Sequence, residues 1–493
     1  MINTRALVLG LGDSGLAMAR FLVARGAAVH VADTRSNPPR LAALRSELPQ
    51  AEFIGGEFLP SLIDDVQLLA LSPGLSPTAS AAAPLVEAAN KRKIDVVGEI
   101  ELFARELARL KAERNYTPKI IGVTGTNGKT TTTRLVGQMI NATEQRAEVA
   151  GNISPAALDA LQARLIADDL PDVWVLELSS FQLATTRSLV CDAGAVLNLS
   201  EDHLDWHTTM ESYVACKRRI FGARTVQVLN RDDPVIAAMA TRVPDAATFG
   251  ADAPGAGNAY GLVIEHGVAW LAWAEDLAAS SRRKKGAEPM PQELLVHRLM
   301  PVDALAIRGV HNTLNALAAI ALARAIGCPL GPMMHALRRY QGEPHRLQLI
   351  ATIDGVEYYD DSKGTNVGAT GAAIEGMSEH DRKLVVILGG DSKGQNFAPL
   401  VKSLVRHARA VVLIGRDAPL IRRALETGLA HVPVLDACSL ERAVTLAAEH
   451  AVAGDAVLLS PACASFDMFR NYVHRGEAFA ASVHELASAP QPC

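Results

Sequence analysis

Short apolar runs alternate along the chain with longer stretches whose apolar residues recur at helical spacing. The first run, residues 6–9, leads into a glycine-rich turn and a helical stretch. Further strand-like runs lie at 66–71, 119–123, 174–177, 384–388, 410–414 and 456–459. Strands that alternate with helices are typical of βαβ units and parallel sheets. The pattern therefore predicts an α/β protein.

Two breaks divide this pattern, at Thr117-Pro118 and at Gly342-Glu343-Pro344. A chain of 493 residues is also too long for a single hydrophobic core. We predict a Rossmann-like domain over 1–117, a central domain with a mostly parallel sheet over 118–343, and a Rossmann-like domain over 344–493. Residues 255–291 are polar and punctuated by glycine and proline, which predicts a hairpin and loop inserted in the central domain.

Charge and composition exclude several classes of protein. The net charge of −5 gives no basic footprint for nucleic acid, and we interpret the basic run at 282–285 as a solvated loop. No apolar run reaches the roughly 18 residues of a membrane span. The six cysteines form no C-x-x-C pair, which favours reduced thiols. We expect a monomeric cytoplasmic protein that neither binds nucleic acid nor inserts into a membrane.

Residues 122–131, GVTGTNGKTT, carry the sharpest chemical signal. A strand precedes this loop and a helical stretch follows it, so backbone N–H groups and the helix N-terminus can hold phosphate groups. Lys129 would neutralise the outer phosphates, and Thr130 would bind Mg²⁺. The glycine spacing departs from G-x-x-x-x-G-K-[ST]. The alternative is a glycine turn that happens to contain a lysine.

A second glycine motif, Gly10-Leu11-Gly12-Asp13-Ser14-Gly15, follows the first strand, and Asp33 ends the next one. This spacing satisfies the dinucleotide fingerprint, so a nicotinamide dehydrogenase is an alternative. The phosphate-loop domain begins near residue 118, however, which leaves little room for a dehydrogenase's catalytic domain.

Acidic residues and a histidine follow two apolar runs of the central segment. Glu177 ends one run, and His203 lies among Glu201, Asp202 and Asp205 after another. An isolated Glu at a strand end is usually a salt-bridge partner, and a single His is usually structural. Beside a phosphate loop, the same residues suit cation binding.

These motifs carry a family resemblance. The loop TGTNGKTT at 124–131, the strand LELSSFQ at 176–182 and the segment EDHLD at 201–205 resemble the ATP and metal motifs of the Mur ligases. The loop is also similar to that of the folylpolyglutamate synthetases, which normally begin at their phosphate loop, so residues 1–117 favour the Mur ligases. Trp206-His207 departs from the basic residue that follows the motif in many relatives. The resemblance implies an ADP-forming ligase with ATP and Mg²⁺ as cofactors.

The resemblance also implies roles for individual residues of the nucleotide site. Lys217 matches a carbamylated lysine that helps to hold a second Mg²⁺. The catalytic residues would be Lys129, Asn152, His203, Lys217 and Lys363. The metal ligands would be Thr130, Glu177, His203 and Lys217. The ATP-binding residues would be Gly125, Thr126, Asn127, Gly128, Lys129, Thr130, Thr131, Asn312, Asn315, Arg346 and Asp361.

Two further sets follow from the same resemblance. The UDP part of a UDP-sugar would contact Ser14, Asp33, Thr34, Arg35, Gly74 and Asn152. Residues 459–476 are similar to the members that add D-glutamate, and the D-N-P-R motif of the diaminopimelate- or lysine-adding members is missing. The D-glutamate site would comprise Thr365, Lys393, Ser465, Phe466 and Tyr472.

The resemblance thus implies a definite reaction. The L-alanyl carboxylate of UDP-N-acetylmuramoyl-L-alanine would be phosphorylated by ATP, and the D-glutamate amine would attack the acyl phosphate. ADP and phosphate would leave, as a step of peptidoglycan precursor synthesis that serves cell shape and division. A phosphate-loop switch or scaffold protein, which would bind ATP without acceptor-dependent turnover, is the non-enzymatic alternative.

Overall fold

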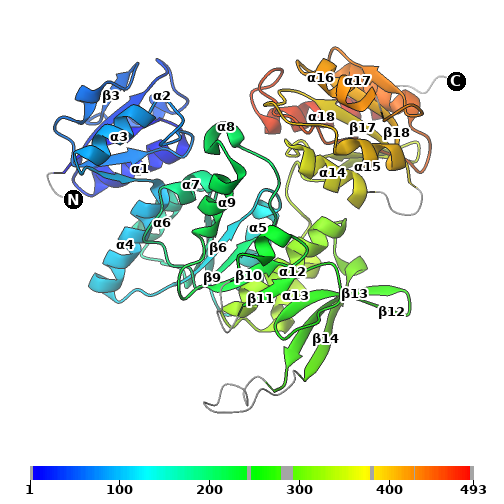
Figure 1. Cartoon of the computed structure of the whole chain (residues 1–493), viewed down its shortest axis with the longest axis horizontal. Coiled ribbons are helices and arrows are strands. Elements are labelled where there is room, and N and C mark those ends of the chain that lie inside the picture. The colour runs from blue at the N-terminus through cyan, green and yellow to red at the C-terminus, as the bar shows by residue number, and fades with distance from the viewer. Residues whose placement is uncertain (1–3, 241–245, 279–292, 378–381, 427, 489–493) are drawn as a thin grey trace. The chain divides into compact units, whose positions relative to one another are not determined.

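The structure is a computed structural model that describes residues 4–240, 246–278, 293–377, 382–426 and 428–488. The chain forms two compact units (Figure 1). Unit 1 comprises Met1–Val302 and Leu314–Arg338, and unit 2 comprises Asp303–Thr313 and Arg339–Cys493. The basic run at 282–285 and most of the loop expected before residue 291 lie outside the described residues.

Unit 1 begins with a parallel sheet of order β3-β2-β1-β4-β5. Its central strands are almost wholly apolar and buried, as strands covered on both faces must be. The strands are β1 (Arg5–Leu9), β2 (Ala28–Asp33), β3 (Glu52–Gly55), β4 (Leu68–Leu71) and β5 (Asp95–Val97). The helices are α1 (Asp13–Ala24), α2 (Leu41–Glu47), α3 (Ala83–Lys91) and α4 (Glu99–Arg114).

The second sheet of unit 1 has the order β14-β13-β12-β11-β10-β9-β6-β8-β7. From β7 to β12 the neighbouring strands are parallel. Apart from β12, these strands are β6 (Lys119–Thr124), β7 (Ala147–Gly151), β8 (Val173–Glu177), β9 (Ala193–Val196), β10 (Val226–Asn230) and β11 (Ala247–Phe249). The connecting helices are α5 (Lys129–Asn141), α6 (Ala157–Ile166), α7 (Ser180–Ala184), α8 (Leu204–His207), α9 (Met210–Arg218) and α10 (Pro234–Ala237).

The expected hairpin insertion extends one edge of this sheet. Strands β12 (Ala259–Glu265) and β13 (Val268–Asp276) pair antiparallel, and β14 (Leu294–Pro301) adds to β13. His266 and Gly267 join β12 to β13 with φ of 50° and 79°. Positive φ at both turn residues matches the right-handed twist of a tight hairpin. Helices α12 (Val310–Ala325) and α13 (Leu330–Arg339) follow β14 in the chain.

Unit 2 contains a sheet of order β15-β16-β20-β17-β18-β19, parallel except for the β15–β16 hairpin. Its strands are β15 (Gln348–Ile353), β16 (Val356–Asp360), β17 (Leu384–Gly389), β18 (Ala408–Ile414), β19 (Val434–Asp436) and β20 (Ala456–Leu459). Its helices are α14 (Val367–Gly376), α15 (Leu400–His407), α16 (Ala418–Glu426), α17 (Leu440–His450) and α18 (Tyr472–Ser488).

The predicted α/β class is confirmed, with three sheets that are mostly parallel. The boundaries predicted at residues 117 and 343 stay predictions. Among the described helices, none has the length and apolarity needed to cross a membrane.

Candidate active site

The phosphate loop joins the end of β6 to the start of α5. Gly128 caps α5 with a φ of 81°, and a Cβ there would come within 2.2 Å of Asn315 Oδ1. A side chain at this position is therefore excluded by both the backbone conformation and the neighbour. The same contact places Asn315 against the loop, as expected of a residue near the nucleotide.

The loop is held by hydrogen bonds to its own lysine and to a neighbouring segment. Lys129 Nζ donates to the carbonyl oxygens of Gly125 and Thr126, at 3.0 and 2.8 Å. The backbone N–H of Asn127 donates to Asn198 Oδ1, at 2.8 Å. The lysine is thus positioned at the start of α5, where the first-turn N–H groups and the helix dipole also favour an anion.

Lys217, on α9, is buried beside this loop. Its Nζ donates to Gly125 O at 2.8 Å and lies 4.6 Å from the centre of the Tyr213 ring. Burial, with the nearby charge of Lys129, holds the pKa of Lys217 well below its usual value. A neutral amine is the form that reacts with CO₂, so the surroundings fit the expected carbamylation.

Glu177 lies at the end of β8, and only one of its two carboxylate oxygens accepts a hydrogen bond within the described part of the chain. Asn152 Nδ2 donates to Glu177 Oε1 at 2.8 Å, and the Asn152 backbone N–H donates to the Glu177 carbonyl. Glu177 Oε2 is buried and has no hydrogen-bond partner among the described residues. A buried carboxylate oxygen without a donor is costly unless a cation meets it, so this residue fits the expected Mg²⁺.

The other expected metal ligands lie on neighbouring elements of unit 1. Thr130 is in the first turn of α5, beside the predicted ATP-binding residue Thr131, and His203 precedes α8 with its ring 4.7 Å from that of Phe181. The described part of the chain has no group of three or more His, Cys, Asp or Glu side chains placed to hold a metal. The expected site does not require one, because a threonine hydroxyl and a carbamylated lysine would complete it.

Trp206 occupies the position where many relatives carry a basic residue. Its indole Nε1 donates to the carbonyl oxygen of Pro73, at 3.1 Å, and Ser76 Oγ donates to the Trp206 carbonyl. Trp206 therefore links α8 to the loop after β4 by two neutral hydrogen bonds, one from its side chain and one to its backbone carbonyl.

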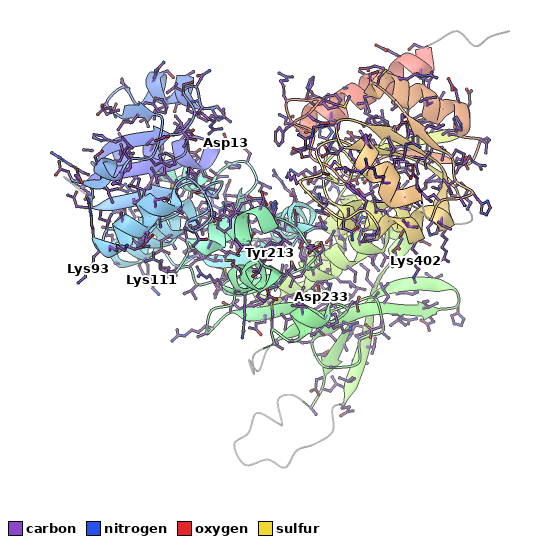
Figure 2. All side chains as sticks on the ribbon, turned by 45° about the horizontal axis from the view of Figure 1, so that its top comes forward. Asp13, Lys93, Lys111, Tyr213, Asp233 and Lys402 are labelled. Carbon is purple, nitrogen blue, oxygen red and sulfur yellow. The ribbon has the colours of Figure 1, made fainter. Side chains whose placement is uncertain are left out.

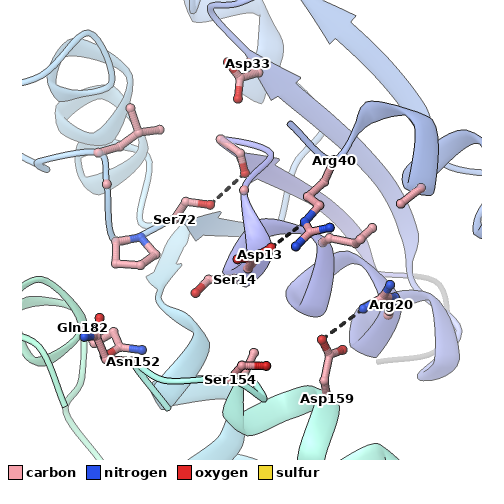
Figure 3. A pocket seen from close by; sticks show the side chains of 18 of the residues that line it. Asp13, Ser14, Arg20, Asp33, Arg40, Ser72, Asn152, Ser154, Asp159 and Gln182 are labelled. Atoms are coloured by element: carbon pink, nitrogen blue, oxygen red, sulfur yellow. Dashed lines mark hydrogen bonds and ion pairs between the residues drawn. The ribbon is translucent and has the colours of Figure 1, made fainter. Parts of the chain in front are cut away.

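A cavity of about 720 Å³ lies between the loops of the first sheet and the loop after β7 (Figure 3). Gly15 lets α1 pack closely on the first loop, because a Cβ there would come within 2.0 Å of Gly10 O. All six predicted UDP-binding residues line the cavity: Ser14, Asp33, Thr34, Arg35, Gly74 and Asn152.

Asp33 lies at one end of this cavity. Its carboxylate accepts from the backbone N–H of Leu11 at 2.8 Å and from the Arg35 guanidinium. Burial acts to raise the pKa of Asp33, but these hydrogen bonds outweigh it and hold the pKa below its usual value. Asp33 is thus an ionised acceptor, suited to the hydroxyl and N–H groups of a nucleoside.

Several cavity residues carried no sequence signal. Arg20 lies on α1 and pairs with Asp159 of α6 at 3.0 Å, and Arg40 pairs with Asp13. Asp13 lies within the glycine motif, but the other three belong to no motif, and only folding brings them together.

In unit 2, Asp361 follows the carboxyl end of β16. Ser460 Oγ donates to Asp361 Oδ2 at 2.7 Å. Burial raises the pKa of Asp361 to about 7, against the opposing effects of Ser460 and of the Arg346 charge. Two predicted ATP-binding residues, Asp361 and Arg346, are therefore neighbours in this unit. Asn312 belongs to the same unit and donates to Arg308 O at 2.8 Å.

Three loops at the carboxyl ends of β16, β17 and β20 meet at Gln395. Its Nε2 donates to the carbonyl oxygens of Thr365, Ser392 and Ala462, at 3.4, 3.1 and 3.4 Å. The predicted acceptor residues Thr365, Lys393 and Ser465 lie on or beside these loops. Gln395 was not among the predicted residues, since nothing in the sequence indicates which loops it would join.

The remaining predicted residues of unit 2 differ in their surroundings. Lys363 Nζ lies 3.7 Å from the centre of the Tyr472 ring, so these two are together. Ser465 is buried, whereas Phe466 is 71% exposed and forms no closed wall in this structure. Arg475, also not predicted, is buried and donates to the carbonyl oxygens of Ser362 and Cys463.

Comparison with known families agrees with this architecture. The Mur ligase MurD-like N-terminal domain matches residues 4–98, the Mur ligase middle domain matches 123–323, and the Mur ligase glutamate ligase domain matches 345–463. The chain belongs to the Mur ligase family.

Relatives more than half identical in sequence carry the name UDP-N-acetylmuramoylalanine–D-glutamate ligase. The protein of that name from Ralstonia nicotianae is 55% identical over 98% of this chain and 97% of its own. One from Burkholderia pseudomallei is 54% identical, with the same coverage.

Solved structures share the fold at low sequence identity. UDP-N-acetylmuramate-alanine ligase from Thermotoga maritima has a TM-score of 0.57 and 17% identity, over 98% of this chain and 100% of that one. The MurF ligase of the same organism, in complex with ADP, has a TM-score of 0.58 and 16% identity, over 99% and 96%.

Proposed function

We propose that this protein is an ATP-dependent, ADP-forming ligase that adds D-glutamate to UDP-N-acetylmuramoyl-L-alanine. The shared name of relatives 54–55% identical over nearly the whole chain supports this function. One structural observation carries it further: six residues expected to bind UDP line one cavity, and one of them, Asn152, is hydrogen-bonded to Glu177. The UDP cavity and the candidate metal residue are thus joined by a single side chain.

The residues of unit 1 have distinct parts in the reaction. The α1 N-terminus and Ser14 hold the diphosphate of the sugar substrate, while Asp33 and Arg35 contact the uridine. Asn152 orients the L-alanyl carboxylate beside the phosphate loop. Lys129 and the loop N–H groups stabilise charge on the transferred phosphoryl group, which is the main demand of phosphoryl transfer.

Two Mg²⁺ ions, when bound, would neutralise charge on the phosphate oxygens. Thr130, Glu177, His203 and carbamylated Lys217 are the residues we assign to hold the two ions. The orphaned Glu177 Oε2 is the feature of this chain that supports the assignment.

Unit 2 supplies the binding site for the acceptor amino acid. Lys393, Thr365 and Ser465 bind the two carboxylates of D-glutamate, with Phe466 and Tyr472 beside its apolar part. Asp361 and Arg346 contact the ATP ribose and phosphates, and Lys363 stabilises the developing charge. The D-glutamate amine attacks the acyl phosphate, a tetrahedral intermediate collapses, and phosphate leaves. We place the protein in the cytoplasm as a monomer.

The test is phosphate release with ATP, Mg²⁺ and UDP-N-acetylmuramoyl-L-alanine against D-glutamate, L-glutamate, L-lysine and diaminopimelate. We expect release only with D-glutamate, with ADP as the second product. Equal turnover with lysine or diaminopimelate would contradict the acceptor, and release of AMP and pyrophosphate would contradict the acyl-phosphate route. Reduction of a nicotinamide cofactor would instead support the dehydrogenase alternative.

A further inference from the structure

Glu99, the first residue of α4, is a buried carboxyl group behind the diphosphate end of the cavity. It is 1% exposed. Its Oε1 accepts from the backbone N–H of Leu158, at 3.2 Å, and the carboxyl group also accepts from the N–H of Ala157 at the start of α6. Its Oε2 lies 3.0 Å from Ser14 Oγ and 3.5 Å from Gln182 Nε2, and both Ser14 and Gln182 line the cavity (Figure 3).

This arrangement sets up a competition for one proton. A serine hydroxyl has a single hydrogen to donate. While Glu99 is ionised, that hydrogen points to Oε2, and the hydroxyl presents only lone pairs to the cavity. A diphosphate oxygen is also an acceptor, so it would meet a lone pair at the very group expected to bind it.

Protonation of Glu99 removes the conflict without breaking any contact. Oε2–H then donates to Ser14 Oγ, and the serine hydrogen turns to the diphosphate. Oε1 remains the acceptor of the Leu158 N–H, because that donor needs only a carbonyl oxygen. Every donor at this position keeps a partner in the protonated form.

We propose that Glu99 is a positioning residue, and that the protein takes up one proton on Glu99 when the UDP-sugar substrate binds. The inference rests on the proposed function, because that function places the diphosphate at Ser14. The proton comes from the solvent, and no covalent bond of the substrate changes.

The surroundings of Glu99 favour such an uptake near neutral pH. Burial raises the pKa of Glu99 to about 7, although the hydrogen bonds it accepts act to lower it. Within the described structure, no charged side chain forms a hydrogen bond or ion pair with Glu99.

The charged groups on the elements packed against α4 are engaged elsewhere. On α1, Arg20 pairs with Glu47 and Asp159, and Asp13 pairs with Arg40. On α6, Arg164 pairs with Glu148 and Asp169. On α4 itself, Glu101 pairs with Arg105, and Glu106 pairs with Arg25 and Arg109. Helix α7 carries no charged residue.

The direction of the pH effect follows from the proton count. Because the complex holds one proton more than the free protein, affinity falls as pH rises above the Glu99 pKa, by about tenfold per pH unit. Below that pKa the free protein is already protonated, and both the uptake and the pH dependence fade.

The experiment is calorimetric titration of the full chain with UDP-N-acetylmuramoyl-L-alanine, without ATP or glutamate, above the Glu99 pKa. Buffers with different ionisation enthalpies report the number of protons taken up. This substrate is a suitable probe because its diphosphate is esterified at both ends, unlike a phosphate monoester whose second pKa is about 6. We expect an uptake approaching one proton.

Three variants test whether the proton is taken up by Glu99 or by another group of the cavity. Glu99→Gln mimics the protonated acid, so it should bind without proton uptake and with affinity independent of pH. Asp159→Asn is the matched control, because burial also raises the pKa of Asp159 in the same cavity. The Asp159→Asn variant should still take up a proton when the substrate binds. Ser14→Ala should bind more weakly and lose the uptake.

The outcomes are distinct. Tight binding by the wild-type protein without proton uptake would overturn this inference and leave the proposed function standing. If proton uptake were lost in Asp159→Asn and kept in Glu99→Gln, the uptake would be assigned to Asp159. If UDP-N-acetylmuramoyl-L-alanine did not bind, that result would contradict the UDP site, the proposed function and the proton uptake on Glu99. If Glu99→Gln fails to fold, the proton uptake of the wild-type protein, measured in the different buffers, still tests the inference.

Discussion

Lys129 and Lys217 both donate to the carbonyl oxygen of Gly125, at 3.0 and 2.8 Å. Two ammonium groups at one carbonyl would repel each other strongly in a buried site. Lys217 is buried, and burial together with the Lys129 charge lowers its pKa, which favours the neutral form of that amine. The pair is therefore suited to the two predicted roles, one cation for the phosphates and one reactive amine.

Replacing Lys129 by alanine should lower turnover by a factor on the order of a thousand, since a preorganised charge at the transferred group is lost. The fold should survive, because the loop is also held by Asn198. Steady-state phosphate release and thermal unfolding measure the two effects. Lys111→Ala, at an exposed lysine of α4, is the control and should retain activity (Figure 2). A folded Lys129→Ala protein with wild-type turnover would contradict the ATP site.

Lys217 should carry a carbamate in the active protein, because its neutral buried amine can react with CO₂. Incubation with ¹³C-bicarbonate should give a carbamate carbon signal by NMR, and Lys217→Met should lack it. Removal of CO₂ should lower turnover, and bicarbonate should restore it. A fully active preparation with unmodified Lys217 would defeat the assignment.

At the scale of elements, the candidate site is built from loops that follow parallel strands. The carboxyl ends of such strands are where open α/β sheets bind ligands. In unit 2 the loops after β16, β17 and β20 share Gln395, and α14 begins directly after the first of them. A change that loosens the start of α14 should therefore disturb the acceptor loops.

Asn366 caps α14, with its side-chain oxygen accepting from the Ala369 N–H at 2.8 Å. Asn366→Ala should cost about 1 kcal/mol of stability, as loss of a helix cap usually does. Asn366→Asp keeps the acceptor and should cost less. Urea unfolding and hydrogen exchange of the first turn of α14 measure both. If exchange there were the same in all three proteins, the cap would not stabilise this helix.

The sequence predicted strands better than the contacts between them. The runs at 384–388, 410–414 and 456–459 became β17, β18 and β20 almost unchanged, because buried parallel strands need uninterrupted apolar residues. The six residues expected at the UDP cavity also meet there. Glu99, Gln395 and Arg475 were missed, since each depends on contacts between segments far apart in the chain.

At the scale of the whole molecule, the predicted ligand residues are divided between the two units. The UDP cavity, the phosphate loop and the candidate metal residues belong to unit 1. The acceptor loops, with Thr365, Lys393 and Ser465, belong to unit 2. We therefore expect turnover to require both units, and a change in one unit to alter recognition of a single substrate.

Lys393 provides the sharpest test of this division. It is exposed, lies just after β17 with a φ of 49°, and its backbone N–H donates to Asp391 Oδ1 at 3.1 Å. The backbone bond fixes the turn and leaves the ammonium group available for a carboxylate. Such a charge-assisted hydrogen bond contributes about 1.5–3 kcal/mol.

Lys393→Met keeps most of the side chain's bulk and removes its charge. We expect the KM for D-glutamate to rise about tenfold to a hundredfold, the equivalent of that energy. The KM values for ATP and the UDP-sugar should change little, because their predicted sites do not include this residue. Kinetics with each substrate varied in turn separate these effects, and Lys402→Met, at an exposed lysine of α15 in the same unit (Figure 2), is the control for loss of charge. An unchanged D-glutamate KM and kcat would make Lys393 a solvated turn residue and would weaken the case for an acceptor site in unit 2. A rise in all three KM values would point to a distorted unit and not to a lost contact.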